Sequence, residues 1–232
     1  MSIPLFLLSA LISVYPQLAL TERTDLSRLD LRYFSSSKND SQADRLVGAI
    51  QSHYARISGL AADFEQIYEA PGQQARSETG RLFLAKPRRM RWEYDSDKLF
   101  VVNDRDVWWY VPADREATHS DARSLNDARL PFLFLLDNPN LKANFTGIEI
   151  AGGNHEDRNQ RLLRLNPKRR DTGVREIIVT SDANGAISKV KLTEDGGATS
   201  QILLKKVREN FHIQATAFAF IPPPGVTVRR QK

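Results

Sequence analysis

The fold of this 232-residue chain is decided by Gly80–Tyr94 (GRLFLAKPRRMRWEY), in which two alternating segments lie on either side of a proline. Large apolar residues occur there at every second position: Leu82, Leu84, Met90 and Trp92. Because successive side chains of a strand point to opposite faces, this spacing places all four on one face. We therefore predict two neighbouring strands, Gly80–Lys86 and Met90–Tyr94, whose shared apolar face is directed inward.

Alternation and turn residues predict further short strands on both sides of this stretch. They are expected at Leu60–Tyr68, Leu99–Val102, Val107–Val111, Asn144–Ile150, Arg161–Leu165, Val174–Thr180, Ala186–Thr193, Ser200–Val207 and Ala217–Phe220. Asn184-Gly185 is a strong hairpin signal, whereas the polar residues 113–130 are expected to form loops or short helices. Since no βαβ rhythm occurs, the sequence predicts a mainly β protein with helices (α+β), built on a single antiparallel sheet of about ten or eleven strands.

One amphipathic helix is predicted before the first strand. Its apolar residues follow helical spacing: Ala43, Leu46, Val47, Ile50, Tyr54 and Ile57. Ser41 precedes Asp44 by three positions, which is the spacing of a capping box. We therefore expect the helix to begin at Ser41 and to end near Ser58.

The N-terminal residues differ from the rest of the chain. Ile3–Leu20 carries no charge and is interrupted by Pro16, which favours a secretory signal peptide over residues 1–21. The basic segment that usually begins such a peptide is missing, and a buried N-terminal helix is the alternative. Residues 22–40 are polar and are expected to form a leader to a single domain at 41–232. Export by the signal peptide would place the protein in the periplasm.

Composition and motifs argue against several classes of function. The chain has 33 Lys and Arg against 28 Asp and Glu, so its net charge of +5 is modest and does not favour nucleic-acid binding. It has no cysteine, and its four histidines lack metal-ligand spacing. No nucleophile elbow, nucleotide-binding loop or other catalytic motif occurs. We therefore expect neither an enzyme nor a metal or cofactor site.

Aromatic residues are concentrated on the predicted central strands: Phe83, Trp92, Tyr94, Phe100, Trp108, Trp109 and Tyr110. One interpretation is the ordinary core of a β-sandwich. The other is a concave sheet whose apolar face is closed by the helix at 41–58 and by Leu130–Leu136 (LPFLFLL), which would leave an apolar cavity.

Five stretches resemble, in the right order, the motifs of the periplasmic outer-membrane lipoprotein carrier (LolA) family. They are Leu60–Gln66 (LAADFEQ), Gly80–Tyr94, Val101–Pro112 (VVNDRDVWWYVP), Leu130–Leu136 and Phe218–Val226 (FAFIPPPGV). Each motif alone is weak, but together they extend over about residues 41–228 and are quite specific.

This resemblance implies an incomplete, strongly curved β-barrel that is closed by a helical lid, and a cavity for the acyl chains of triacylated lipoproteins. The residues that it implies for the cavity are Phe64, Leu82, Leu84, Met90, Trp92, Leu133 and Leu135. It further implies that a monomeric carrier receives lipoproteins from an ATP-driven inner-membrane complex and delivers them to an outer-membrane acceptor.

Two of the implied site residues have ordinary alternatives. Lys86 stands where the family typically has an arginine that ties the lid by hydrogen bonds, but a solvated lysine at a strand end is the other interpretation. Met90 corresponds to an apolar residue at the cavity mouth, and its flexibility suits varied acyl chains. An ordinary core methionine is nearly as consistent with the sequence.

Three other functions remain to be compared with carriage. The outer-membrane acceptor of the same fold group is normally lipid-anchored through a cysteine, which this chain lacks. A lipid-binding or envelope-stress sensor module of the same fold would normally carry a second C-terminal domain. A secreted lipid hydrolase would need a nucleophile elbow, which is absent.

Overall fold

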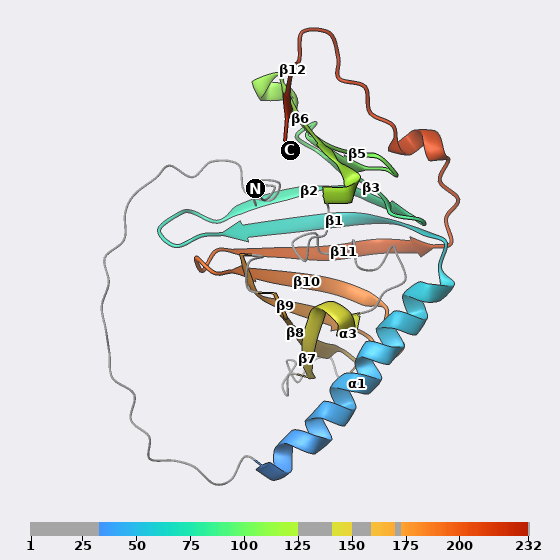
Figure 1. Ribbon diagram of the computed structural model, residues 1–232, viewed down its shortest axis with the longest axis vertical. Coiled ribbons are helices and arrows are strands. Elements are labelled where there is room, and N and C mark those ends of the chain that lie inside the picture. Colours follow the sequence, from blue (N-terminus) through green and yellow to red (C-terminus); the bar gives the residue numbers. More distant parts are fainter. Residues whose placement is uncertain (1–32, 125–140, 150–158, 170–172, 232) are drawn as a thin grey trace.

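The computed structural model describes residues 33–124, 141–149, 159–169 and 173–231. Twelve strands of this part of the chain form one sheet, in the order β12-β6-β5-β4-β3-β2-β1-β11-β10-β9-β8-β7 (Figure 1). The strands are β1 (Gly59–Glu69), β2 (Arg76–Ala85), β3 (Arg89–Tyr94), β4 (Leu99–Val102), β5 (Asp106–Val111), β6 (Glu116–Asp121), β7 (Phe145–Glu149), β8 (Arg161–Pro167), β9 (Val174–Ser181), β10 (Ile187–Glu194), β11 (Thr199–Glu209) and β12 (Thr227–Arg230). The two edge strands, β12 and β7, do not pair with each other, so the sheet is not closed.

The helices of the described residues are few. They are α1 (Tyr33–Arg56), the single turn α3 (Leu141–Asn144) and three 3₁₀ turns at Pro112–Asp114, Ala122–Ser124 and Ala215–Phe218. In the described part of the chain, no helix is both long enough and apolar enough to span a membrane.

The predicted sheet is confirmed as mainly β but is mixed rather than antiparallel. β12 pairs with β6 in parallel, whereas every other neighbouring pair is antiparallel. Neither β6 nor β12 was predicted, because Glu116–Asp121 lies in a polar region and all four residues of β12 are exposed. These two strands form through their pairing with neighbours and not through an apolar alternation.

Two further boundaries differ from the prediction. The segment Ala217–Phe220 is not a strand, since Ala217 and Phe218 belong to a 3₁₀ turn. The side chains of Phe218 and Phe220 belong to the apolar cluster on one side of the sheet. The helix begins at Tyr33 and not at Ser41, so Ser41 lies inside α1 and does not cap it. Serine in a helix interior costs only about 0.5 kcal/mol, so a polar segment can continue a helix that is anchored further along.

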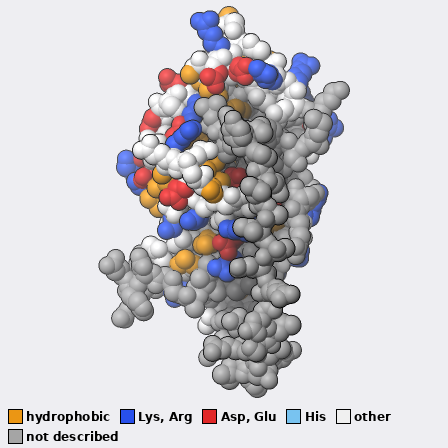
Figure 2. Space-filling view, turned by 90° about the vertical axis from the view of Figure 1, so that its left-hand side faces the viewer, with side chains coloured by type: hydrophobic (Ala, Val, Ile, Leu, Met, Phe, Trp, Pro, Cys, Tyr) orange, Lys and Arg blue, Asp and Glu red, His pale blue; other side chains and the backbone are white. Residues whose placement is uncertain are grey.

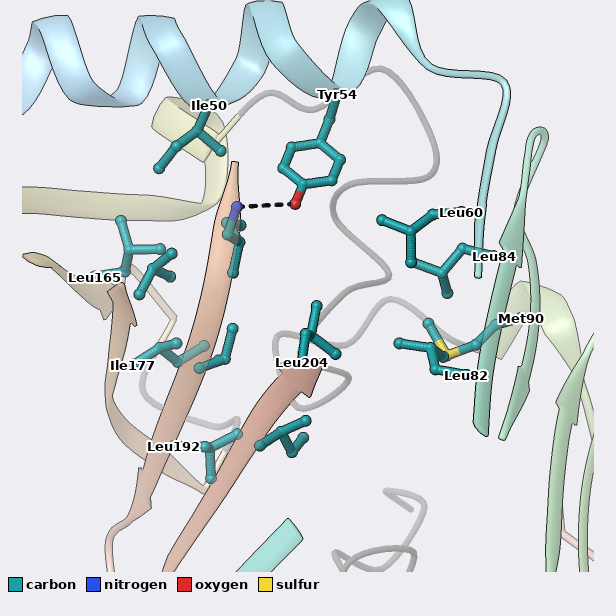
Figure 3. Packing of buried hydrophobic residues seen from close by; sticks show 14 of the residues in the cluster. Ile50, Tyr54, Leu60, Leu82, Leu84, Met90, Leu165, Ile177, Leu192 and Leu204 are labelled. Atoms are coloured by element: carbon teal, nitrogen blue, oxygen red, sulfur yellow. Dashed lines mark hydrogen bonds between the residues drawn. The ribbon is translucent and has the colours of Figure 1, made fainter. Parts of the chain in front are cut away.

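Alternation divides each central strand between two faces of the sheet. The side that we call the inner face carries one large buried cluster, which includes residues of α1 as well as of β1–β5 and β7–β11. Figure 3 shows residues of this cluster under α1 and on β9 and β10, such as Ile50, Ile177 and Leu192, and others on β1–β3, such as Leu60 and Met90. The helix and both halves of the sheet therefore share a single core.

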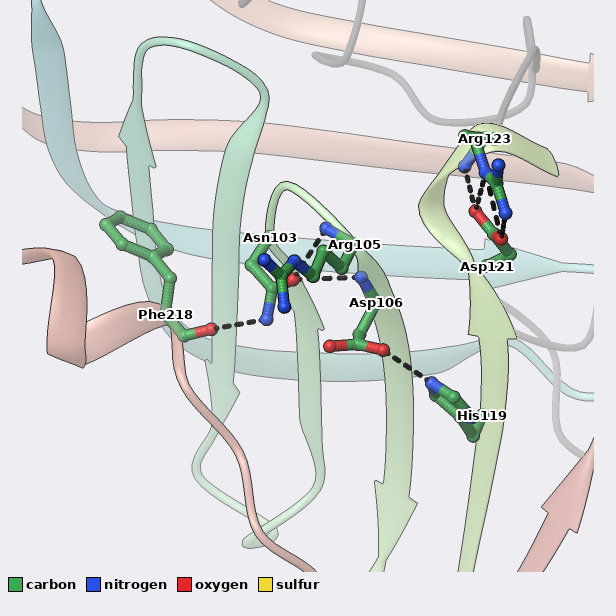
Figure 4. Close-up of polar contacts among 7 residues, drawn as sticks. All are labelled: Asn103, Arg105, Asp106, His119, Asp121, Arg123 and Phe218. Carbon is green, nitrogen blue, oxygen red and sulfur yellow. Dashed lines mark hydrogen bonds and ion pairs between the residues drawn. The ribbon is translucent and has the colours of Figure 1, made fainter.

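The opposite side, the outer face, has a smaller cluster that is covered by the C-terminal segment. Ala85, Val101 and Phe218 are its buried members. The side-chain amide of Asn103 donates a hydrogen bond to the carbonyl of Phe218 at 3.2 Å (Figure 4). Arg91 donates another to the carbonyl of Ala217 at 3.1 Å. These bonds hold the segment against the outer face before it continues to β12.

Candidate functional site

The inner face around β1, β2 and β3 contains the described residues that the sequence singled out for a cavity. Exposed fractions of 4% or less show that all of them are buried: Phe64, Leu82, Leu84, Met90 and Trp92. They belong to one apolar cluster, as the period-two spacing requires. Leu133 and Leu135, which were predicted to complete this site, lie outside the described residues.

Aromatic rings form the centre of this face. The Phe64 ring lies 4.8 Å from that of Trp92 and 5.1 Å from that of Tyr94, both in edge-to-face geometry. Tyr94 contacts Trp109 in the same way at 5.8 Å. Edge-to-face pairs add a preferred geometry to the burial of apolar area. The face is therefore a well-defined aromatic surface.

Gly80 makes the position of Phe64 possible. The two residues are direct partners in the β1–β2 register. A Cβ atom at Gly80 would lie 2.9 Å from the Phe64 ring and 2.0 Å from the carbonyl oxygen of Glu93. Only glycine fits there, so the first residue of the Gly80–Tyr94 stretch shapes the inner face.

The C-terminal turn of α1 is held at several points beside this face. The Lys86 ammonium donates hydrogen bonds to the carbonyls of Tyr54 at 2.5 Å and Ala55 at 3.0 Å. A cation at the C-terminal end of a helix also interacts favourably with the helix dipole. Burial lowers the pKa of Lys86 below the ordinary value. Lys86 thus contacts the helix and is not simply solvated at the end of β2.

Tyr54 connects the same turn to the other half of the sheet. Its hydroxyl accepts a hydrogen bond from the backbone N–H of Ile187 at 3.2 Å, which is the dashed line in Figure 3. Burial raises the pKa of Tyr54 well above its ordinary value, so the hydroxyl stays neutral. Nearby, His53 pairs with Glu209 at 2.6 Å. The end of α1 is therefore joined to the residue after β2 by Lys86, to β10 by Tyr54 and to β11 by His53.

A hollow of about 550 Å³ lies beside β10 and β11 at this end of the sheet. Pairing between the two strands extends only to Lys189 and Leu203, so the hollow lies where they separate. Two of its lining residues, Ile187 and Leu204, belong to the inner-face cluster, while Asp182 and Glu209 contribute carboxylates. The volume is within the usual range of small-molecule sites.

A second hollow, of about 670 Å³, lies on the outer face between β1, β2 and β11. Its lining includes Phe83 and Phe211 but also the charged residues Asp63, Arg81, Lys206 and Arg208. Lys206 pairs with Asp63 at 2.9 Å and lowers the pKa of that carboxyl.

In Figure 2, acidic and basic side chains are interspersed on the described part of the face that is shown, in keeping with a modest net charge.

Among the described residues, no group of three or more His, Asp or Glu side chains is placed to hold a metal ion. The inner face suits apolar binding, because the side chains of its cluster are aliphatic or aromatic. Neither of the two hollows is lined by the five buried residues that the sequence singled out.

Comparisons with known proteins agree with this description. The family model described as "Outer membrane lipoprotein carrier protein LolA" matches residues 55–221. The outer-membrane lipoprotein carrier protein of Pectobacterium carotovorum subsp. carotovorum is 27% identical over 188 residues, covering 79% of this chain and 87% of that protein. That of Methylococcus capsulatus is 26% identical over 204 residues, covering 86% and 92%. Among solved structures, an uncharacterized conserved protein from Thermus thermophilus has a TM-score of 0.52 at 9% identity, covering 82% of this chain and 99% of that one, which shows a similar fold.

Proposed function

Because the chain belongs to the LolA family of outer-membrane lipoprotein carrier proteins, we propose that it is a periplasmic carrier that binds the acyl chains of lipoproteins. In this proposal it takes lipoproteins from an ATP-driven inner-membrane complex and delivers them to an outer-membrane acceptor. The observation that supports it most is the family match over residues 55–221, which includes most of the strands of the inner face.

The physical need for such a carrier follows from the hydrophobic effect. Each buried CH₂ group contributes about 0.8 kcal/mol, so a molecule with three acyl chains does not cross an aqueous space unescorted on a useful timescale. An apolar surface that shields the chains removes this barrier. Release at the far membrane requires only moderate affinity, and no catalytic step is involved.

The proposed binding surface is the inner face, with Phe64, Leu82, Leu84, Met90 and Trp92 in contact with acyl chains. Their place in one apolar cluster supports this assignment, and an acyl chain would contact them once the atoms that now cover them move aside. Curvature of the sheet and a helical lid belong to the same proposal. Lys86 would act as the latch, because its two hydrogen bonds fix the end of α1.

Adjacent tryptophans allow a direct test, because Trp108 and Trp109 point to opposite faces. Trp109 packs against the inner-face cluster, whereas Trp108 stacks on His119 at 4.3 Å and contacts Phe220 on the outer face. Two single-tryptophan proteins are needed: Trp92→Phe/Trp108→Phe retains Trp109, and Trp92→Phe/Trp109→Phe retains Trp108. Each protein is titrated with a triacylated lipopeptide whose acyl chains carry bromine. Bromine quenches the fluorescence of a tryptophan that it contacts.

We expect the brominated lipopeptide to quench the fluorescence of Trp109 and to leave that of Trp108 nearly unchanged. The deacylated peptide should quench the fluorescence of neither residue. Equal quenching of both residues, or binding that quenches only Trp108, would contradict the inner-face site. If brominated fatty acid binds as tightly as the lipopeptide, the function changes to general lipid binding, which is the alternative within this fold.

A further inference from the structure

Four buried polar side chains interrupt the apolar inner face near the C-terminal end of β1, where the chain turns toward β2. They are Gln66, Tyr68, Tyr94 and Ser200, with exposed fractions of 3%, 7%, 6% and 1%. The Tyr94 hydroxyl donates a hydrogen bond to Gln66 Oε1 at 3.0 Å, and Gln66 Nε2 donates one to Ser200 Oγ at 3.1 Å. We call these four residues the polar cluster.

Tyr68 belongs to the same face but not to this hydrogen-bond network. It follows Gln66 by two residues on β1, and it is the direct register partner of Ser200 on β11. Its hydroxyl is buried and has no hydrogen-bond partner among the residues that the structure describes. A buried hydroxyl in this state costs stability, so a reason for its presence is needed.

The polar cluster contains more donors than its own hydrogen bonds use. The amide of Gln66 carries two N–H groups, and each of the three hydroxyls carries one O–H. The two hydrogen bonds within the cluster use only two of these hydrogens. This count holds whichever way the Gln66 amide is oriented, because each bond consumes one hydrogen in either case. The cluster therefore has unused donors. Its oxygen atoms also have unused lone pairs, but a buried oxygen tolerates an unused lone pair more readily than a buried donor tolerates the lack of an acceptor, so an incoming acceptor suits the cluster.

The surroundings of the cluster decide which acceptor fits. Phe64 and Ile202 continue the inner face beyond Gln66 and are buried and apolar. Burial raises the pKa of the Tyr94 hydroxyl, so this donor stays neutral. The ammonium of Lys98, which lies 4.9 Å from the centre of the Tyr94 ring, is paired with the carboxylate of Glu78. A neutral acceptor with an apolar chain attached suits such a place better than a charged one, whose desolvation would be costly.

We infer that the polar cluster binds a carbonyl oxygen of the ester or amide group that links an acyl chain to the rest of its molecule. The chain itself then extends along the inner face from Gln66 toward Leu204, which pairs with Phe64 in the β1–β11 register. This inference rests on the proposed function, because it assigns the polar end of the same binding surface. It adds that the site distinguishes acyl chains from alkyl chains.

The test compares pairs of ligands of equal chain length, one with a carbonyl oxygen and one without. For the ester, the probes are 1,2-dioctanoylglycerol and 1,2-di-O-octylglycerol, which differ only in the carbonyl oxygens. For the amide, they are N-octyloctanamide and dioctyl ether, in which an ether oxygen also replaces the amide N–H. Binding to the full chain is measured by calorimetry. We expect the carbonyl-bearing member of at least one pair to bind about fivefold more tightly, the ratio that one net hydrogen bond supplies. The pair that shows the preference identifies the linkage.

Tyr68→Phe removes the unpaired hydroxyl, and Ser200→Ala removes a second donor in case the first variant folds poorly. We expect each to reduce the carbonyl preference toward onefold. Tyr68→Phe should keep or raise the melting temperature, which a merely structural tyrosine would not do. The matched control is Tyr110→Phe on the outer face, where the ring lies 5.2 Å from Phe220. This control should retain the full preference.

The outcomes separate the two proposals. Equal binding of both members in both pairs, as expected if a water molecule satisfies the donors, overturns the inference and leaves the carrier function intact. A preference that persists in both Tyr68→Phe and Ser200→Ala also overturns it. Failure of the unaltered protein to bind any of the four probes or a triacylated lipopeptide overturns the proposed function itself.

Discussion

Gly185 is the point at which the β9–β10 turn contacts α1. The turn is closed by bonds from Gly185 N to Asp182 O at 3.2 Å and from Asp182 N to Ala186 O at 3.0 Å. Gly185 has a φ of +90°, and a Cβ atom there would lie 2.5 Å from backbone atoms of Ala49 and Ile50. We predict that Gly185→Ala separates the helix from the turn and lowers stability strongly.

A second turn of the same kind supplies the control. Gly197 has a φ of +84°, and the bonds from Gly197 N to Glu194 O at 3.0 Å and from Glu194 N to Ala198 O at 2.9 Å match those of the first turn. A Cβ atom at Gly197 would meet only the Pro71 side chain, at the ordinary distance of 3.5 Å. Gly197→Ala therefore measures the cost of the left-handed backbone alone.

The expected magnitudes follow from these contacts. A left-handed alanine costs roughly 1–2 kcal/mol, which applies to both variants. In Gly185→Ala the helix must also retreat by about 1 Å to restore ordinary contact, and forcing an extra carbon into a packed place costs about 1–3 kcal/mol more. The difference between the variants, about 1–3 kcal/mol, is the energy of the contact between the turn and α1.

Urea unfolding followed by tryptophan fluorescence gives the free energy of unfolding of each variant. We expect Gly185→Ala to shift the midpoint clearly further than Gly197→Ala does. Hydrogen exchange should show that the backbone amides of α1 between Ile50 and Arg56 lose more protection in Gly185→Ala than in Gly197→Ala. Equal destabilisation by the two substitutions, with no change in exchange in α1, would refute the close packing of the helix on this turn.

Three further predictions concern other contacts. Lys86→Met should lower the free energy of unfolding by about 1–2 kcal/mol in urea, because it removes the bonds to the end of α1, and Lys86→Arg should recover part of the loss. The Asp121 carboxyl, which is hydrogen-bonded to Arg123, should titrate by NMR with a pKa of about 2, and Arg123→Ala should return that pKa toward 3.8. The contribution of this carboxyl to folding stability should be complete above pH 3.8 and should be lost as the pH falls through 2. Phe218→Ala should cost about 3–5 kcal/mol of stability, since the ring is 1% exposed, yet leave acyl binding to folded protein unchanged.

How far the sequence predicts this fold depends on whether a strand buries one face. β2 and β3 alternate clearly, and their predicted bounds agree with the structure to within one residue, apart from four additional residues at the start of β2. β12 is exposed along its whole length, so it carries no alternation that could reveal it. Its pairing with β6 depends on where the C-terminal segment lies after it crosses the outer face, which is a long-range property.

The site shows a similar division. The apolar members of the inner face follow from period-two spacing, whereas the hydrogen bonds between Gln66, Tyr94 and Ser200 join residues up to 134 positions apart in sequence. Asn184-Gly185 was correctly predicted as a turn. Its contact with α1 could not be predicted, because the sequence signal reports the local backbone and not what lies against it.

The aromatic residues of the central strands show why composition alone does not locate a binding surface. They do not share one face: Trp92, Tyr94 and Phe100 belong to the inner cluster, whereas Phe83 and Trp108 pack with the C-terminal segment on the outer face. Both groups are packed within the chain, and they differ in the face of the sheet on which they lie. Aromatic enrichment between residues 83 and 110 consequently reflects two structural tasks, and the proposed acyl-binding surface includes the inner group alone. A substitution on the outer group should thus affect stability alone, whereas one on the inner group should affect stability and binding together.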